Sequence, residues 1–434
     1  MHRSLLGWSS LDRSSEDVMR IMLAAVMVAA AALGDQSAFS DFRRERPGVV
    51  HKITVADLPA PGATRAVQNP PTVVTRPATA KPETLPGYTV TLYADGFNNP
   101  RIIRTAPNGD LFVAQSQPGT VKAIRGGAKA QDVETFATGL NRPFGIAFYP
   151  PGPDPTHVYV GNTNSVVRFP YRAGDLKARG PQEVIVAALP SGGAPDAEHW
   201  TRDIAFSRDG RKMFVSVGSA SNVDEENNPL ERERAVIYEF NPDGSGRRIY
   251  ASGIRNAVGL AIHPQTGQLW ASVNERDGLG DNLVPDYVTH VEEGAFYGWP
   301  WFYMGGHQDP RHEGKHAELK SKVKTPDVLV QPHSASLAMT FYNGSQFPAE
   351  HRDSIFVAQH GSWNKSMRTG YKVIRVPLKG GAPTGEYQDF LTGFVTEDAE
   401  VWGRPVGVAV ASDGALLVTD DASNAIWRVS YGGR

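Results

Sequence analysis

The chain lacks several features that would point to particular functions. It has no cysteine among its 434 residues. This excludes disulfide bonds, thiolate metal sites, a cysteine nucleophile and c-type haem attachment. It also lacks a strong charge of either sign, because its formal net charge is −2. Without a basic field, attraction to nucleic acid or to an anionic membrane is not expected.

The apolar run near the start is too short for a membrane-spanning helix. Ile21–Gly34 (IMLAAVMVAAAALG) has 14 residues, whereas a spanning helix needs about 20. Arg20 precedes the run and small residues end it, a pattern typical of a signal peptide. Residues 1–34 are therefore predicted to be an N-terminal extension with a signal peptide, no stable membrane span is expected, and the protein is predicted to be periplasmic or secreted. The alternative is an uncleaved amphipathic or buried helix.

Residues 35–84 show little apolar periodicity and are rich in proline, alanine, threonine and arginine. Such a composition predicts a disordered linker without a core of its own. The folded, catalytic domain is therefore predicted to comprise residues 85–434.

One phrase of turn and strand recurs six times in this domain. It is clearest in GLNRPFGIAFYP, and the copies begin at Gly96, Gly139, His199, Gly253, Ser334 and Gly403. Most copies add a second, third and fourth strand, so the prediction is an all-β fold, a six-bladed β-propeller with four-stranded blades. The echo VTLYADGF, Val90–Phe97, precedes the first copy and is predicted to pair with the last one, which closes the ring. A β-sandwich or two barrels are the alternatives, but those folds have no reason to repeat one phrase.

Polar residues that precede the inner strands are predicted to converge on the propeller axis. They include Asn98, Asn99, Arg101, Asn141, Arg142, Glu198, His199, Arg202, Arg255, Asn256, His333, Trp402 and Arg404. Arginine binds carboxylates in bidentate geometry, so the prediction is a cationic pocket for a small polyanion. Solvated turn residues, or salt bridges between blades, are the alternative.

Two features suggest chemistry in this pocket. His199 directly precedes a strand and suits a general base, with Glu198 or Asp203 as its orienting partner; a structural histidine is the alternative. The Gly-rich acidic loop Asn274–Asn282 suits Ca²⁺, although an ordinary charged turn would look similar. Lys365 or Arg368, in the loop of the fifth copy, could reach an anionic ligand.

The phrases GIRNAVGLAIHPQTGQLWASVNERDGLGDN, GAFYGWP and HWTRDIAFSRDG resemble the soluble pyrroloquinoline quinone (PQQ)-dependent sugar dehydrogenases, and within them the glucose/sorbosone dehydrogenase group. The resemblance runs from about Leu85 to the C-terminus and implies a six-bladed propeller. It also implies PQQ- and Ca²⁺-dependent oxidation of an aldose or a sorbosone-like aldehyde, with electrons passed to an external acceptor.

The resemblance further implies a role for each matching residue. His199 would take the substrate proton, and Arg255 would polarise the quinone carbonyl. Carbonyl groups of Arg276 and Asp277 would bind Ca²⁺. The cofactor-binding residues would be Arg142, Asn256, Lys365, Arg368 and Arg404.

Two other functions fit a propeller. A lactonase-type hydrolase would need a divalent metal held by acidic and amide side chains at the hub, where this sequence has mainly basic residues. A non-catalytic binding propeller would have lost its cofactor, and the presence of His199 with Arg255 and Asn256 disfavours this.

Overall fold

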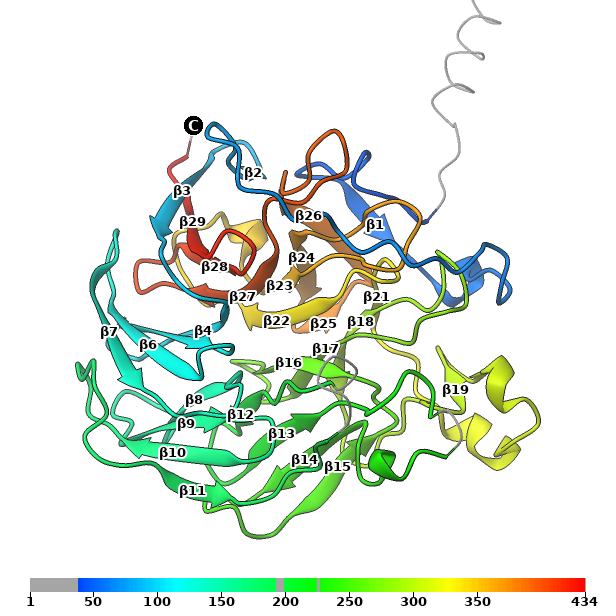
Figure 1. Cartoon of the computed structure of the whole chain (residues 1–434), viewed down its shortest axis with the longest axis horizontal. Coiled ribbons are helices and arrows are strands. Elements are labelled where there is room, and N and C mark those ends of the chain that lie inside the picture. The colour runs from blue at the N-terminus through cyan, green and yellow to red at the C-terminus, as the bar shows by residue number, and fades with distance from the viewer. Residues whose placement is uncertain (1–37, 193–198, 225–226, 434) are drawn as a thin grey trace, which may run out of the picture. The chain divides into compact units, whose positions relative to one another are not determined.

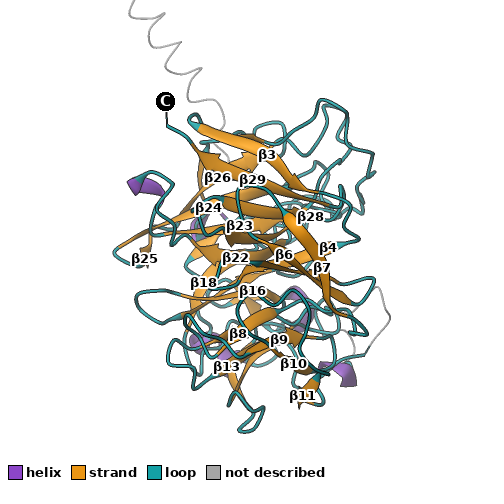
Figure 2. Cartoon of the chain, turned by 90° about the vertical axis from the view of Figure 1, so that its left-hand side faces the viewer, coloured by secondary structure: helices purple, strands orange, loops and turns teal. Residues whose placement is uncertain are grey.

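The protein is built from β-sheets arranged around a common centre (Figure 1). The structure is a computed structural model that describes residues 38–192, 199–224 and 227–433, and Phe39–Arg434 form one compact unit. The segment predicted as a signal peptide lies outside the described residues. Within those residues, no helix has both the length and the apolar character needed to cross a bilayer. Strands joined by loops make up nearly all of the structure, with only short helical turns (Figure 2).

Five sheets have four antiparallel strands each. The first contains β4 (Pro100–Thr105), β5 (Leu111–Gln115), β6 (Thr120–Arg125) and β7 (Gln131–Ala137). The second contains β8 (Ile146–Tyr149), β9 (His157–Gly161), β10 (Val166–Pro170) and β11 (Glu183–Val186). The third contains β12 (Ile204–Phe206), β13 (Met213–Val217), β14 (Val236–Phe240) and β15 (Arg248–Ser252). The fourth contains β16 (Ala257–Ile262), β17 (Leu269–Val273), β18 (Tyr287–Val291) and β21 (Val328–Leu329). The last contains β27 (Pro405–Val410), β28 (Leu416–Asp420), β29 (Ala425–Tyr431) and β3 (Tyr88–Ala94).

The fifth copy of the repeat lies in a larger sheet of seven strands. Its strands are β22 (Ser336–Phe341), β23 (Ser354–Gln359), β24 (Lys372–Lys379), β26 (Glu386–Thr392), β25 (Ala382–Pro383), β1 (Val50–Lys52) and β2 (Glu83–Thr84). The prediction of six four-stranded blades is therefore wrong: five blades have four strands, and the remaining sheet is enlarged by strands from the N-terminal segment.

The remaining elements are short. They are the hairpin β19 (Phe302–Tyr303) and β20 (His307–Gln308), and the 3-10 turns η1 (Val55–Asp57), η2 (Pro229–Glu231), η3 (Pro310–His312), η4 (Ala317–Lys322) and η5 (Ala349–His351).

The inner strands contact one another in a closed circle, in the order β4, β8, β12, β16, β22 and β27. This is the arrangement of a β-propeller. The predicted closure is confirmed, because β3 pairs with β29 and Leu92 lies opposite Trp427. The first part of the domain and its last strand thus share one sheet.

The glycine of the repeated phrase allows neighbouring inner strands to approach. A Cβ added to Gly145 would lie 2.5 Å from the carbonyl oxygen of Arg202, and one added to Gly259 would lie 2.5 Å from that of Leu337. Such distances are far below van der Waals contact, so a larger residue would push adjacent blades apart.

The second strand is wholly buried in five of the six repeats. β5, β13, β17, β23 and β28 contain only buried residues. Each blade lies between two others, so both of its faces pack against apolar side chains. This explains why these strands read as continuous apolar runs rather than alternating ones. Burial of a large side chain such as Trp270 in this core contributes on the order of 3 kcal/mol.

The N-terminal segment is ordered against the propeller, and the prediction of a disordered linker is wrong for its described residues. Lys52 of β1 lies opposite Glu386 of β26. Lys372 of β24 is fully buried, and its Nζ lies 3.0 Å from a carboxylate oxygen of Glu45 and 2.7 Å from one of Asp389. The segment is therefore held by a buried ion-pair network and by strand pairing, together with the packing of a few apolar residues such as Ile53.

Candidate functional site

A cavity of about 1070 Å³ lies among the loops at the ends of the inner strands. Five residues predicted to belong to one site line it: His199, Arg255, Asn256, Asp277 and Arg404. They come from the loops around β12, β16, β17 and β27. The propeller therefore brings together residues that are up to about two hundred positions apart, as the repeat phase predicts.

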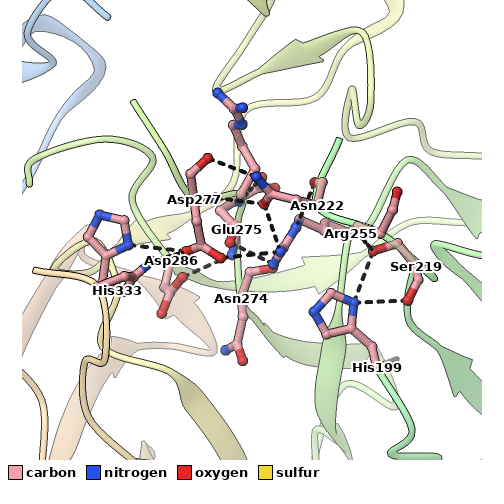
Figure 3. Close-up of polar contacts among 12 residues, drawn as sticks. His199, Ser219, Asn222, Arg255, Asn274, Glu275, Asp277, Asp286 and His333 are labelled. Carbon is pink, nitrogen blue, oxygen red and sulfur yellow. Dashed lines mark hydrogen bonds and ion pairs between the residues drawn. The ribbon is translucent and has the colours of Figure 1, made fainter. Parts of the chain in front are cut away.

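One ring nitrogen of His199 is within hydrogen-bond distance of Ser219. Its Nδ1 lies 2.9 Å from the carbonyl oxygen of Ser219 and 2.9 Å from Ser219 Oγ (Figure 3). Because a carbonyl oxygen only accepts, Nδ1 carries the proton of the neutral ring and Nε2 keeps its lone pair. Burial, and then the charge of Arg255, lower the pKa of His199 to about 3. At neutral pH His199 is therefore an uncharged acceptor on the cavity.

Of the two predicted carboxylate partners, Asp203 does not orient His199. Glu198 lies outside the described residues. Asp203 instead pairs with Arg104 at 2.8 Å and accepts the backbone N–H of Leu260 at 2.8 Å. The carbonyl group of Ser219 takes the role that was predicted for a carboxylate.

Arg255 is buried and held by oxygen atoms on several sides. Its Nε donates to the carbonyl oxygen of Asn222 at 3.0 Å, and its Nη1 donates to that of Glu275 at 2.7 Å. Its Nη2 lies 3.5 Å from the carboxylate of Asp277. The guanidinium is thus a fixed positive charge in the wall of the cavity, and its orientation costs nothing further when a ligand binds.

Asn256 presents an acceptor that the described residues do not satisfy. Its Oδ1 is buried without a hydrogen-bond partner among them. A Cβ on Gly218 would lie 2.4 Å from this oxygen and 2.6 Å from His199 Cβ, so glycine there lets Asn256 and His199 approach each other. A buried polar atom without a partner costs about 1–3 kcal/mol, which a ligand donor could recover.

Glu275 and Asp277 of the acidic loop, and Asp286 shortly after it, bring three carboxyl groups to the cavity in different states. Burial raises the pKa of Glu275 to about 8 and that of Asp286 to about 6. Burial alone would also raise the pKa of Asp277, but hydrogen bonding from His333 and the charge of Arg255 lower it to about 2. Asp277 is therefore the carboxylate of this loop that stays ionised throughout the physiological range.

The metal site predicted at Arg276 and Asp277 rests on backbone oxygens. The carbonyl oxygen of Asp277 accepts from Asn222 Nδ2 at 2.9 Å. The side chain of Arg276 is buried and lies 3.4 Å from Asp309. In the described parts of the chain, no cluster of three or more His, Asp or Glu side chains could hold a metal ion. Carbonyl ligands are not covered by that finding, so Ca²⁺ at this loop stays a prediction.

His333 contacts two residues of the acidic loop, Asp277 and Gly280. Its Nδ1 lies 3.3 Å from Asp277 Oδ1, and its Nε2 lies 3.0 Å from the carbonyl oxygen of Gly280. Each ring nitrogen of His333 thus faces an oxygen atom of the acidic loop. His333 therefore fixes Asp277 in place.

A third histidine, His360, lines the cavity and was not predicted as a site residue. Its Nε2 lies 2.8 Å from Asp421 Oδ1, and the carboxylate of Asp421 also lies 2.5 Å from Arg101. Burial, and then the charge of Arg404, lower the pKa of His360 to about 4. The residue gave no signal in the sequence, because a lone histidine after a strand is usually structural.

Arg404 has terminal nitrogens without a protein partner. Its Nε donates to the carbonyl oxygen of His360 at 3.4 Å and its backbone N–H donates to Asp420 at 2.8 Å. Within the described residues its Nη atoms make no hydrogen bond, and the side chain lines the cavity. Arg404 is therefore equipped to bind an anion.

Three predicted cofactor residues do not line the cavity. The guanidinium of Arg142 lies 4.4 Å from the centre of the ring of Trp200, which itself lines the cavity. Lys365 Nζ lies 3.4 Å from the carbonyl oxygen of Ser40. Arg368 Nη2 donates to the carbonyl oxygen of Pro70 at 3.0 Å. The interpretation of Lys365 and Arg368 as ligand contacts is corrected by this placement, because both cations contact the N-terminal segment.

Aromatic and amide side chains complete the cavity, and sequence reasoning did not assign them to it. Trp200 follows His199 directly, and Trp363 is 45% exposed although it is large and apolar. Asn364 Nδ2 donates to Asp277 Oδ1 at 2.5 Å. The signal that could have found them is position, since they adjoin residues that were chosen from the repeat.

The fold and the cavity together define a β-propeller with a polar, arginine-containing pocket on its axis. The sequence pattern of the TrAA12-like family matches residues 82–293 and 301–432, and the chain belongs to this family. The resemblance to the soluble PQQ-dependent sugar dehydrogenases is confirmed at this level.

Three relatives illustrate the likeness. The pyrroloquinoline quinone-dependent pyranose dehydrogenase of Coprinopsis cinerea is 25% identical over 410 residues, which cover 79% of this chain and 53% of the relative. The chain thus spans about half the length of that enzyme. The holo form of its PQQ domain is 21% identical with a TM-score of 0.69, covering 82% of this chain and 100% of the domain. The calcium structure of a Trichoderma reesei family AA12 protein is 19% identical with a TM-score of 0.68, covering 81% and 97%.

Proposed function

We propose that this protein is a PQQ- and Ca²⁺-dependent dehydrogenase. It oxidises an aldose or a sorbosone-like aldehyde and passes the electrons to an external acceptor. The observation that carries the proposal is the placement of His199 beside Arg255 and Asn256, with Nε2 of His199 free of hydrogen bonds to the described residues. The relatives named as PQQ-dependent sugar dehydrogenases support it.

The hydrogen-bond donors that line the cavity suit an anionic cofactor. PQQ carries three carboxylates, and the Nη atoms of Arg404 are free to bind one in bidentate geometry. The unsatisfied Oδ1 of Asn256 is buried beside His199 and matches a donor on the ligand. The cavity volume of about 1070 Å³ admits both a cofactor and a small sugar. When bound, PQQ would supply the quinone that accepts hydride.

The residues of the chain would then perform three tasks. His199 Nε2 accepts the proton of the substrate hydroxyl, since Nδ1 is held by Ser219. Arg255 places a fixed positive charge where negative charge develops on an oxygen. Trp200 and Trp363 supply apolar surface in the wall of the cavity.

A cation at the acidic loop belongs to the same proposal. Carbonyl oxygens of Arg276 and Asp277 would hold Ca²⁺, together with oxygens of the cofactor. The ionised carboxylate of Asp277 adds favourable charge nearby. Support comes from the ionisation of Asp277 and from the relative that is named as a calcium structure.

The hydrolase alternative gains no support from the described residues. A lactonase-type metal would need acidic and amide side chains as ligands, and in the described part of the chain no group of three or more His, Asp or Glu side chains could hold one. Export to the periplasm or the medium remains part of the proposal, and it rests on the apolar run Ile21–Gly34 alone.

Reconstitution of the purified chain tests the proposal. PQQ would be titrated with and without Ca²⁺ while its absorbance is followed, and a panel of aldoses and sorbosone would then be added with an artificial electron acceptor. The expected result is stoichiometric binding that needs Ca²⁺, and bleaching of the cofactor by at least one sugar. Absence of binding at micromolar PQQ would contradict the proposal and favour a binding propeller.

A further inference from the structure

The segment Gly62–Val74 runs along the loops that form the cavity. It lies outside the match to the family pattern, which begins at residue 82. Most of its residues are exposed, and its composition gives no indication of a structural task. Its hydrogen bonds nevertheless fall on three loops that each carry a residue of the site.

The first of these loops carries Asp277. The backbone N–H of Gly62 donates to the carbonyl oxygen of Leu279 at 2.9 Å. The backbone N–H of Asp281 donates to Thr64 Oγ1 at 2.7 Å. Both contacts lie within four residues of Asp277, so the segment constrains the loop that holds this carboxylate.

The second loop carries Trp363 and Asn364, and it is held mainly by Asn69. The backbone N–H of Asn69 donates to the carbonyl oxygen of Trp363 at 2.7 Å. Its Nδ2 donates to the carbonyl oxygens of Lys365 at 3.0 Å and of Ser366 at 3.2 Å. Its Oδ1 accepts from Arg368 Nη2 at 3.2 Å, and its carbonyl oxygen accepts from Arg368 Nη1. One asparagine therefore makes hydrogen bonds to four residues of this loop, Trp363, Lys365, Ser366 and Arg368.

The third loop carries Arg404. The backbone N–H of Val401 donates to the carbonyl oxygen of Thr72 at 2.9 Å, and the backbone N–H of Val74 donates to the carbonyl oxygen of Val401 at 2.9 Å. Val73 and Val401 form an isolated parallel bridge. Val401 lies only three residues before Arg404, so this pairing constrains the approach of Arg404 to the cavity.

We propose that the segment Gly62–Val74 positions these three loops for ligand binding, with Asn69 as the main positioning residue. A loop that is ordered before the ligand arrives loses less conformational entropy on binding. Cavity residues from three separate loops thereby keep their mutual geometry in the free protein. The inference rests on the proposed function only for the identity of the ligand.

Hydrogen–deuterium exchange of the full chain without ligand tests the positioning directly. Asn69→Ala is compared with Gln68→Ala, which removes the neighbouring amide side chain; Gln68 is exposed and makes no hydrogen bond within the described residues. We expect amide exchange in residues 362–369 to rise roughly tenfold in Asn69→Ala and to stay unchanged in Gln68→Ala. Exchange in β9 and β10, far from the segment in the sequence, should not change. Unchanged exchange in residues 362–369 would overturn the inference.

A second variant keeps the test decisive if Asn69→Ala loosens the whole propeller. Asn69→Asp retains an acceptor for Arg368 but loses the amide donor to Lys365 and Ser366. We expect it to fold with an unchanged melting temperature and to show an intermediate rise in exchange in the same loop. A rise that is equal in all blades would mean a role in overall stability only, and would contradict the inference.

Ligand binding separates this inference from the proposed function. In the wild type, PQQ affinity tests the proposed function. In Asn69→Ala we expect the PQQ dissociation constant to rise about tenfold, with a smaller effect in Asn69→Asp. If the wild type binds no PQQ, the proposed function fails while the exchange experiment still decides the positioning role. If the wild type binds PQQ and Asn69→Ala binds it equally well, the positioning role fails.

Discussion

Two of the three histidines that line the central cavity, His199 and His360, have different kinds of hydrogen-bond partner. His199 Nδ1 lies 2.9 Å from a carbonyl oxygen, that of Ser219. His360 Nε2 lies 2.8 Å from a carboxylate, that of Asp421. A carboxylate neighbour ordinarily raises the pKa of a histidine, because it stabilises the imidazolium, whereas a neutral carbonyl does so less. On partners alone, His360 would be the charged residue of the two.

Both imidazoles are nevertheless neutral. The pKa is lowered to about 3 for His199 and to about 4 for His360, with burial as the larger cause in each case. The carboxylate of Asp421 is also shared with Arg101 at 2.5 Å, and Arg404 adds positive charge nearby. The comparison teaches that the positive charge of the cavity comes from its arginines. The histidines supply lone pairs.

The residues around His199 differ from those around His360, so the lone pairs of the two imidazoles suit different tasks. His199 adjoins Asn256 across Gly218 and feels the charge of Arg255, which are the residues proposed to meet the reacting atoms. His360 adjoins Arg101 and Arg404, which suit a carboxylate of the ligand. We therefore assign the general base to His199, and to His360 the role of a hydrogen-bond acceptor that orients the ligand.

The largest expected effect is that of His199→Ala. Loss of the general base should lower kcat by about 10²–10⁴. The PQQ dissociation constant should change by no more than about threefold, because the side chain faces the substrate. Steady-state kinetics with an artificial acceptor, combined with a PQQ titration, measures both. A large loss of PQQ affinity would show that His199 serves binding instead.

Arg404→Ala should have the largest effect on binding. Removal of its free Nη donors should weaken PQQ affinity by roughly 10–100-fold, as expected for a charge-assisted hydrogen bond in a buried site. Arg211→Ala removes an arginine whose side chain is 84% exposed and serves as the matched control. An unchanged PQQ affinity in Arg404→Ala would remove this residue from the site.

His360→Asn sharpens the comparison, because asparagine keeps a polar side chain in the cavity. We expect kcat to fall by less than about tenfold and KM or the PQQ dissociation constant to rise by a similar factor. Measurement of both parameters over one substrate series decides between the tasks. If kcat fell as far as in His199→Ala, the roles of the two histidines would have to be exchanged.

A smaller effect is expected in the pH dependence of stability. An unfolded histidine binds its proton near pH 6.5, whereas folded His360 binds it only near pH 4. The unfolded state therefore takes up more protons between these values, and the free energy of unfolding falls as pH drops below 6.5. His360→Asn should reduce this loss by about 1 kcal/mol between pH 6.5 and 5 in urea unfolding, while leaving it unchanged above pH 7. An identical slope in variant and wild type would contradict the lowered pKa.

The repeats made the propeller fold predictable from the sequence. Gly145 and Gly259 recur at one phase because adjacent inner strands approach there, and the echo at Val90–Phe97 marks the strand that closes the ring. The same phase located His199, Arg255, Asn256 and Arg404 at one cavity. Periodic constraints of this kind are visible in a single chain.

The features that could not be predicted depend on contacts between parts of the chain that are distant in the sequence and do not belong to the repeat. The burial of Lys372 with Glu45 and Asp389 joins a polar N-terminal segment to the fifth repeat, and composition alone suggested disorder. Lys365 was assigned to a ligand for its charge, although its Nζ contacts Ser40. His360 was missed because its role depends on Asp421, which lies sixty-one residues further along the chain.

The difference between the two histidines is tested most directly by single-turnover reduction. The PQQ- and Ca²⁺-loaded wild type, His199→Ala and His360→Asn would each be mixed rapidly with a sugar that reduces the wild type, and bleaching of the cofactor would be followed. The account predicts a rate at least about 100-fold lower in His199→Ala and within about tenfold of the wild type in His360→Asn. Equal rates in His199→Ala and the wild type would contradict the assignment of His199 as the base.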